Sequence, residues 1–353
     1  MPKRLPDNCV TLYADLMQKV LDSAIVTLAG GSFTSKMIGD ARYWYYQLRT
    51  LTGQTQKYLG KETPELLELI EKAKQDRASA SAILNERRRL VSMLIAGGAS
   101  AEKGRPAKIL GKMSDSGLFA SGGVLVGSFA FGCYGNVLGV HMEQGLSRTE
   151  DMDFSDAREM NIGFVRNMKA DLVEAEPSLA TPPQINPRIV PFEMRAPDGF
   201  KIEFLTTRVG VHDKSPVLIE RLGVHAQPLE YMDYLLDQTQ PAVILNGAGI
   251  LVAIPQPARY AAHKLAVSQL RETGNQPKIK KDINQACALM RVLMEDNPGV
   301  LDAAFEAVIE RDDHMGVFVR KGFALLPEDV KAAARQVCGS VAQIEKAKIS
   351  LRT

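Results

Sequence analysis

Two aspartates one residue apart in a strand-like run are the part of the chain best suited to chemistry. Asp151 and Asp153 flank Met152 and are followed by Phe154. In an extended strand alternate side chains share a face, so the two carboxylates point one way and the apolar side chains the other. Adjacent carboxylates repel each other unless a divalent cation lies between them. The pair therefore predicts a cation site, and the alternative is a solvated strand edge.

A third carboxylate stands in a later strand-like run. Glu203 has apolar neighbours on both sides, as Asp153 does. With Asp151 and Asp153 it would complete an oxygen-rich site for Mg²⁺, a hard ion usually shared between protein carboxylates and substrate phosphates. Glu193, on the partner strand of a hairpin that turns at residues 197–199, is the nearest rival. We expect Glu203 to be the third ligand.

A Gly-Ser pair closes the apolar run 124–126. Gly127 and Ser128 come after this predicted strand and before a predicted helix. At such a place backbone N–H groups and a serine hydroxyl can meet an anion without a Cβ in the way. The position predicts phosphate binding; the alternative is a strand end that needs a small residue.

The elements that must position these residues divide the chain into three parts. Residues 1–118 are predicted to be mainly helical, with one β-hairpin at about 42–60. Strand patterns cluster in 119–213, and helical patterns dominate 214–353. We therefore expect an α+β fold with a mixed β-sheet core, a helical N-terminal region carrying the hairpin, and a helical C-terminal domain.

Composition narrows the classes of protein. Of 353 residues 45% are hydrophobic and 24% charged, which is ordinary for a globular protein, and the net charge of +2 supplies no global basic field for nucleic acid. The four cysteines lack metal spacing and are expected to be reduced, and the five histidines lack a zinc-binding pattern. No signal peptide or membrane span is expected, so the prediction is a cytoplasmic protein.

The Gly-Ser turn, the two-carboxylate strand and the later third carboxylate, in this order, resemble the nucleotidyltransferase superfamily that includes DNA polymerase β. The resemblance covers residues 120–206. Outside it, the aromatic run 42–46 with residues 58–60 and the helical run 257–265 are similar to a bacterial branch of nucleotidyltransferases in abortive-infection and toxin–antitoxin systems.

The spacing departs from the compact one common in the superfamily. Asp151 follows Ser128 by 23 positions. The extra residues, about 135–147, contain glycine and are expected to form a loop beside the site.

The resemblance implies a chemistry and a role for each residue. Asp151 and Asp153 would bind two Mg²⁺ ions, with Mn²⁺ as a substitute, and Glu203 would bind one of them. Gly127 and Ser128 would hold the β- and γ-phosphates of a nucleoside triphosphate. Two cations about 4 Å apart can activate an attacking hydroxyl and neutralise the leaving pyrophosphate. The implied reaction transfers a nucleoside monophosphate to an acceptor hydroxyl.

A lysine and an aspartate in the helical C-terminal part extend the resemblance. Related toxins place a helical lysine and a later aspartate in similar order, which implies a triphosphate clamp at Lys264 followed by Asp282. Their alternatives are a solvated lysine and an aspartate that stabilises a helix dipole from the first turn. The basic run of Lys278, Lys280 and Lys281 is either a solvated helix start or a contact for phosphates of a nucleotide or RNA.

The sequence does not determine the acceptor or the oligomeric state. A tRNA 3′ end, a protein side chain and a small molecule are the three acceptor classes considered. The rival function is a non-catalytic, NTP-binding regulatory or toxin–antitoxin component with the same fold. The aromatic residues 43–46 could stack on bases, although packing of an aromatic hairpin on a helix is the commoner use.

Overall fold

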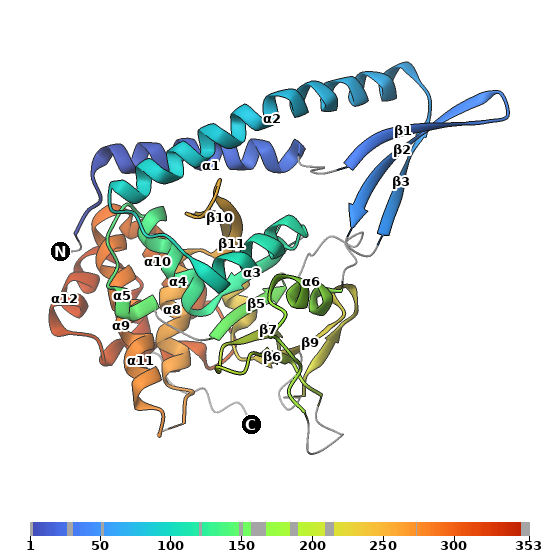
Figure 1. Ribbon diagram of the computed structural model, residues 1–353. Helices are drawn as coiled ribbons and strands as arrows, with labels where there is room; N and C mark the ends of the chain where they lie inside the picture. The colour runs from blue at the N-terminus through green and yellow to red at the C-terminus, as the bar shows by residue number, and fades with distance from the viewer. Residues whose placement is uncertain are drawn as a thin grey trace.

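The computed structural model confirms the expected α+β fold, with a mixed sheet between helical N-terminal and C-terminal parts (Figure 1). No helix in the part of the chain that it describes combines the length and apolarity that a membrane span needs. The structure describes residues 3–26, 31–50, 53–119, 122–147, 151–156, 167–183, 190–208, 215–272 and 274–346.

The central sheet has six strands in the order β4-β5-β7-β9-β8, with β6 paired to β7. Strands β5, β7 and β9 are parallel, whereas β4, β6 and β8 pair antiparallel with their neighbours. One face is apolar because Met152, Phe154, Ile202 and Phe204 alternate with polar residues and are buried. The strands are β4 (Gly123–Val126), β5 (Asp151–Asp156), β6 (Glu193–Arg195), β7 (Lys201–Thr207), β8 (Val217–Ile219) and β9 (Val224–Leu229).

Short helices and a further hairpin surround this sheet. The helix α4 follows β4 without a loop, and α6 lies in the crossover that parallel strands β5 and β7 require. These elements are α3 (Gly104–Asp115), α4 (Gly127–Val137), α5 (Gln144–Ser147), α6 (Met168–Ala175), a 3₁₀ turn η2 (Glu220–Leu222), α7 (Met232–Leu236), β10 (Thr239–Ile244) and β11 (Ile250–Pro255).

The C-terminal part is a group of helices around α8, which is buried on nearly all sides. A Cβ at Gly322 would overlap the backbone of Leu265, so α11 and α8 touch almost backbone to backbone. The helices are α8 (Pro257–Ser268), α9 (Gln276–Asp296), α10 (Pro298–Ile309), α11 (Met315–Ala324), α12 (Glu328–Val337) and α13 (Val341–Ile344).

The N-terminal part combines two long helices with a three-stranded sheet. Thr63 caps α2 by accepting a hydrogen bond from the Leu66 amide, and the 33 residues of α2 span about 50 Å. Figure 1 shows α1 running alongside α2 and the sheet standing out at the N-terminal end of α2. The elements are α1 (Asp7–Val26), β1 (Gly31–Ile38), β2 (Ala41–Thr50), β3 (Gly53–Lys61) and α2 (Pro64–Ala96).

The structure departs from three sequence expectations. The predicted hairpin at 42–60 is part of a three-stranded sheet, because β1 pairs with β2 along its whole length. Residues 135–147 include the end of α4 and all of α5, so they are not simply a loop. Strands β8 and β9 follow residue 213 but complete the central sheet. The division into three domains stays a prediction.

Candidate functional site

Strand pairing places the acidic residues in one row across the sheet. Asp153 lies opposite Glu203 in the parallel pair β5–β7, and Glu193 lies opposite Glu203 in the antiparallel pair β6–β7. Side chains at paired positions share a face. Asp151, two residues before Asp153, shares that face as well. The structure therefore brings together the three predicted carboxylates and the rival Glu193.

Gly127 lies directly against this row. It follows Val126, the β4 residue that pairs with Asp153, and its φ is +64°. A Cβ at Gly127 would overlap Oδ2 of Asp153. Glycine is required here by both the left-handed backbone and the close approach of the carboxylate. The predicted Gly-Ser turn and the predicted carboxylates are thus parts of one site.

Lysines balance part of the negative charge. Lys201 Nζ lies 2.6 Å from Glu203 Oε1 and 3.7 Å from Asp151 Oδ2. Burial alone would lower the pKa of Lys201, but the hydrogen bond and charge of Glu203 outweigh it and raise the pKa above its ordinary value. Lys278 Nζ lies 3.9 Å from Asp151 Oδ2. Sequence reasoning missed Lys201, although its position two residues before Glu203 in one strand places it on the same face.

The negative charges around Asp153 outweigh the positive ones. Burial, followed by the charges of Glu203 and Asp151, raises the pKa of Asp153 to about 7, and Lys264 and Lys201 offset this only in part. Such carboxylate oxygens are the donors that Mg²⁺ prefers, so the residue types fit a divalent cation. Among the residues that the structure describes, no three Asp, Glu, His or Cys side chains are arranged so that they could hold a metal ion without moving. The ammonium of Lys201 lies among them instead.

The start of α4 faces the carboxylates and is tied to the C-terminal helices. Its N-cap, Val126, makes no side-chain capping hydrogen bond. The Tyr260 hydroxyl of α8 donates to Gly127 O at 2.8 Å and lies 3.1 Å from Gln285 Oε1 of α9. Sequence reasoning missed Tyr260 and Gln285. The spacing of Tyr260 four residues before Lys264, on the same helical face, is a signal that could have found it.

Lys264 and Asp282 are brought together as a buried ion pair. Lys264 Nζ lies 2.7 Å from Asp282 Oδ1, and Arg271 Nε lies 2.5 Å from Asp282 Oδ2. Burial alone would raise the pKa of Asp282, but Lys264 and Arg271 outweigh it and hold the pKa below its usual value. Because α9 begins at Gln276, Asp282 lies in its second turn. An interaction with the dipole from the first turn therefore does not explain this aspartate.

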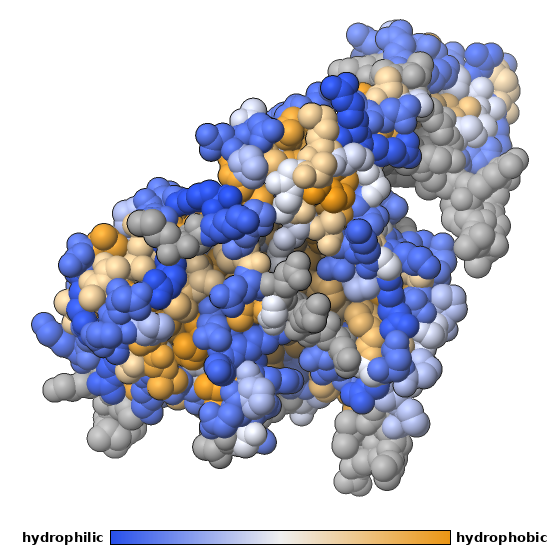
Figure 2. Space-filling model, turned by 60° about the vertical axis from the view of Figure 1, so that its left-hand side comes forward, coloured by the Kyte–Doolittle hydropathy of each residue, from blue (hydrophilic) through white to orange (hydrophobic). Residues whose placement is uncertain are grey.

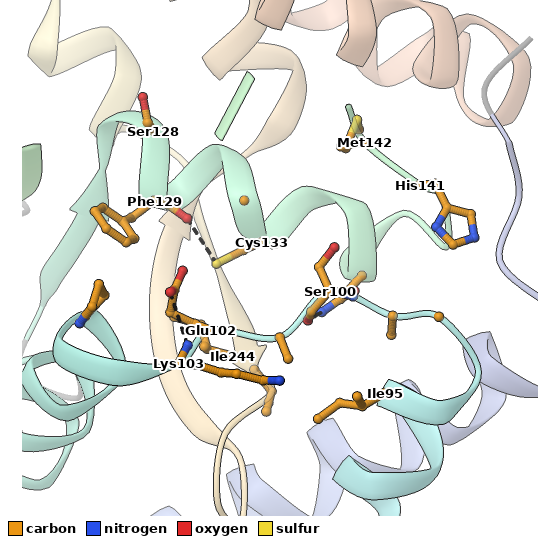
Figure 3. A pocket seen from close by; sticks show the side chains of 17 residues that line it. Ile95, Ser100, Glu102, Lys103, Ser128, Phe129, Cys133, His141, Met142 and Ile244 are labelled. Atoms are coloured by element: carbon orange, nitrogen blue, oxygen red, sulfur yellow. Dashed lines mark hydrogen bonds between the residues drawn. The ribbon is translucent and has the colours of Figure 1, made fainter. Parts of the chain in front are cut away.

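A cavity of about 890 Å³ runs along α4 (Figure 3). Its volume is in the range of small-molecule sites. Figure 3 shows Ser128 in the first turn of α4 and His141 beyond its other end, with Glu102 between them on the facing loop. Asp151, Asp153 and Glu203 are not in its lining. The lining residues are Ile95, Gly98, Ala99, Ser100, Ala101, Glu102, Lys103, Pro106, Ser128, Phe129, Gly132, Cys133, Asn136, His141, Met142, Val243 and Ile244.

A comparison with protein-family models finds a match. A family model described as nucleotidyltransferase matches residues 105–310. No curated protein and no solved structure matches the chain significantly. The matched stretch contains the carboxylate row, the Gly-Ser turn and the Lys264–Asp282 pair, and it begins after α2. Because this family model covers more than half of the chain, the chain belongs to the nucleotidyltransferase family.

Proposed function

We propose that the chain transfers a nucleoside monophosphate from a nucleoside triphosphate to an acceptor hydroxyl and releases pyrophosphate, with Asp151, Asp153 and Glu203 holding divalent cations. The observation that carries this proposal is the alignment of Asp153 with Glu203 directly beside Gly127. It supports a site in which carboxylate-bound cations and a phosphate-binding helix start share the same substrate.

The phosphates bind at the start of α4 in this proposal. The N–H groups of its first turn have no side-chain cap, and the Ser128 hydroxyl adds a further donor. Lys278, half-exposed beside Asp151, supplies a cation that can reach the triphosphate. The nucleoside occupies the cavity along α4, because this cavity begins at Ser128.

The carboxylates supply the cation and proton sites. When bound at Asp151, Asp153 and Glu203, Mg²⁺ or Mn²⁺ would neutralise the pyrophosphate and lower the pKa of the acceptor hydroxyl. Lys201 binds Oε1 of Glu203, so Oε2 would hold the cation. The carboxylate that lies nearest the acceptor oxygen would accept its proton. Lys201 also holds the Glu203 carboxylate in place between substrate turnovers.

Transfer of label from α-³²P-labelled nucleoside triphosphates tests the proposal. Incubation of each nucleotide with Mg²⁺, protein and a cell lysate should give a labelled product. Asp151→Asn and Asp153→Asn should each lower transfer by at least about 100-fold, because each removes a charge that holds the cations. Asp312→Asn, at an exposed position between α10 and α11, is the matched control and should leave transfer unchanged. Wild-type rates in both site variants would overturn the proposal.

Two further variants identify the third carboxylate. Glu203→Gln should lose transfer, whereas Glu193→Gln should keep most of it, because Glu193 is paired with Arg195 at 2.8 Å. The opposite result would assign the role to Glu193.

Digestion of the labelled product with ribonuclease or protease, and filtration by mass, separates RNA, protein and small-molecule acceptors. Nucleotide binding by calorimetry without pyrophosphate release would instead favour a non-catalytic component.

A further inference from the structure

The sheet β1–β3 differs in composition from the rest of the chain. Residues 31–61 carry five basic side chains and one acidic side chain, whereas the net charge of all 353 residues is +2. None of its described side chains belongs to the buried core. The segment also contains six aromatic residues, including the only tryptophan of the chain: Phe33, Tyr43, Trp44, Tyr45, Tyr46 and Tyr58.

One face of this sheet is turned toward α2. Trp44 Nε1 donates to Glu62 Oε2 at 2.8 Å, and Lys74 Nζ of α2 lies 5.9 Å from the Trp44 ring centroid. Arg42, on the same side of β2, lies 3.6 Å from Glu62. These contacts use the aromatic and basic groups of this face within the protein.

The opposite face carries two tyrosines between two lysines. Lys36, Tyr43 and Lys61 pair across the three strands and therefore share a side. Tyr45, two residues after Tyr43 in β2, joins them, and Lys36 Nζ lies 5.1 Å from its ring centroid. Both lysines are exposed and both tyrosines are half-buried. We call Lys36, Tyr43, Tyr45 and Lys61 the outer face.

We propose that the outer face binds a single-stranded segment of nucleic acid. Aromatic rings on an open sheet stack on unpaired bases, and adjacent lysines contact the phosphates between them. Charge complementarity favours this occupant, since a second copy of the chain that docked by the same surface would bring an equally basic face against it. Figure 2 shows the end of the molecule that carries the sheet projecting from the body, with mostly hydrophilic side chains.

The distance between the outer face and the cavity suits a polymeric substrate. The sheet precedes the N-terminal end of α2, and the loop after its C-terminal end supplies Gly98 to Lys103 of the cavity wall. The two ends lie about 50 Å apart. Only an extended substrate can contact both, so the acceptor of the transfer is a nucleic acid strand. This assignment of the acceptor depends on the proposed function, whereas binding at the outer face does not.

Fluorescence anisotropy with a fluorescein-labelled oligouridylate and the full-length protein tests the binding. Tyr43→Ala and Tyr45→Ala should each weaken it by at least about 5-fold, the lower end for one base–aromatic stack. Tyr43→Phe and Tyr45→Phe keep the rings and should restore affinity. The control is Met37→Ala, 59% exposed and next to Lys36 on the other face, which should bind like the wild type.

A salt series tests the lysines. The double variant Lys36→Gln/Lys61→Gln should reduce the slope of log affinity against log salt concentration by about 0.7 for each phosphate that the variant no longer neutralises.

Asp151→Asn should lose transfer and keep oligouridylate affinity, which separates failure of the catalytic proposal from failure of this one. Labelled transfer to the oligouridylate 3′ end by the wild type would support the acceptor assignment, and its absence with every nucleotide would overturn that assignment.

Three results would overturn the binding proposal. The first is wild-type affinity in both tyrosine-to-alanine variants. The second is a loss of affinity that circular dichroism traces to unfolding and that the phenylalanine variants do not rescue. The third is light scattering that shows a wild-type dimer becoming a monomer in the alanine variants at unchanged oligouridylate affinity, which would make the outer face a contact between copies of the chain.

Discussion

Asp153 is subject to three local constraints at once. It pairs with Glu203 across β5–β7, lies close to Asp151, and packs its carboxylate against Gly127. Burial and the first two raise the free energy of its charged form, and the third blocks movement of its carboxylate toward α4. The site therefore holds negative charge in a fixed place, which is the condition for strong cation binding.

Gly127→Ala tests the packing of this carboxylate. Alanine would have to adopt the left-handed backbone of Gly127, which costs about 1–2 kcal/mol. Its methyl group would also overlap Asp153 Oδ2, which adds about 1–3 kcal/mol. Urea denaturation should show both losses in the wild-type background. In an Asp153→Ala background only the backbone part should remain. Equal losses in the two backgrounds would show that the two residues do not touch.

Asp153→Asn tests the charge. Because the pKa of Asp153 is raised to about 7, its ionisation destabilises the fold, and this destabilisation grows as the pH rises from about 4 through 7. Without metal at pH 8, the variant should therefore melt at a higher temperature than the wild type, and at pH 4 the difference should vanish. Mg²⁺ should raise the melting temperature of the wild type more than that of the variant. A variant that is less stable at pH 8 would contradict the assigned charge balance.

At the scale of elements, α8 joins the site to the C-terminal helices. One of its faces sends Tyr260 to Gly127 and Lys264 to Asp282, and another accepts the close approach of Gly322. A helix fixed on several sides cannot shift without moving the start of α4. Its hydrogen bonds and ion pair should therefore affect both stability and nucleotide binding.

Tyr260→Phe separates these two effects. Loss of the hydroxyl removes the bond to Gly127 O and should lower the free energy of unfolding by about 1 kcal/mol. It should also raise KM for the nucleotide more than it lowers kcat, because the start of α4 is less firmly held. Tyr234→Phe is the matched control, since its buried hydroxyl donates to Ala304 O and makes no contact with Gly127. An unchanged KM in Tyr260→Phe would make this tether purely structural.

Lys264→Met tests the buried pair. The change leaves Asp282, whose side chain is 3% exposed, with Arg271 alone, and should cost about 3–5 kcal/mol of stability. Lys264→Met/Asp282→Leu should recover much of this loss, because the buried carboxylate is gone and the charge that remains, on Arg271, has a side chain that is 31% exposed and can be solvated. Chemical denaturation measures both. If the double variant is less stable than the single one, the pair does not act as a unit.

Local signals explain which elements were predictable. The Pro-Asp-Gly turn at 197–199 predicted the β6–β7 hairpin. Thr63 followed by a proline is a local signal of the same kind for the start of α2. The alternation at Asp151 and Asp153 predicted their shared face. Strands β10 and β11 were not predicted, although Asn246-Gly247 between their two apolar runs is a hairpin signal. Pro241 within β10 weakens the strand pattern. The contact of Tyr260 with Gly127 joins residues 133 positions apart and has no local cause.

At the scale of the whole molecule, a small buried apolar cluster and several hydrogen bonds attach α1, and the residues before it, to the body. The Val243 amide donates to Tyr13 Oη at 2.8 Å, and this hydroxyl donates to Val243 O at 3.1 Å. Backbone bonds from His141 to Lys3 O and from Leu5 to Gly139 O, both 2.8 Å, add to this attachment. Through α1 these bonds also hold α2, which packs along it.

Tyr13→Phe tests the attachment. It leaves the buried Val243 amide and carbonyl without their partner, so stability should fall by about 1–3 kcal/mol. Limited proteolysis should then cut the N-terminal part earlier than in the wild type, while the C-terminal helices stay resistant. Simultaneous loss of both parts would mean that the chain unfolds as one unit.

The continuity of α2 has a mechanical consequence. The 32 residues of α2 that follow Pro64 include neither glycine nor proline, the usual causes of a sharp kink, so we expect the helix to move as a rigid rod. A tilt of about 5° about one end displaces the other by about 4 Å, given its length of about 50 Å. We therefore expect a displacement of the sheet β1–β3 to move residues 98–103, which line the cavity beside Ser128.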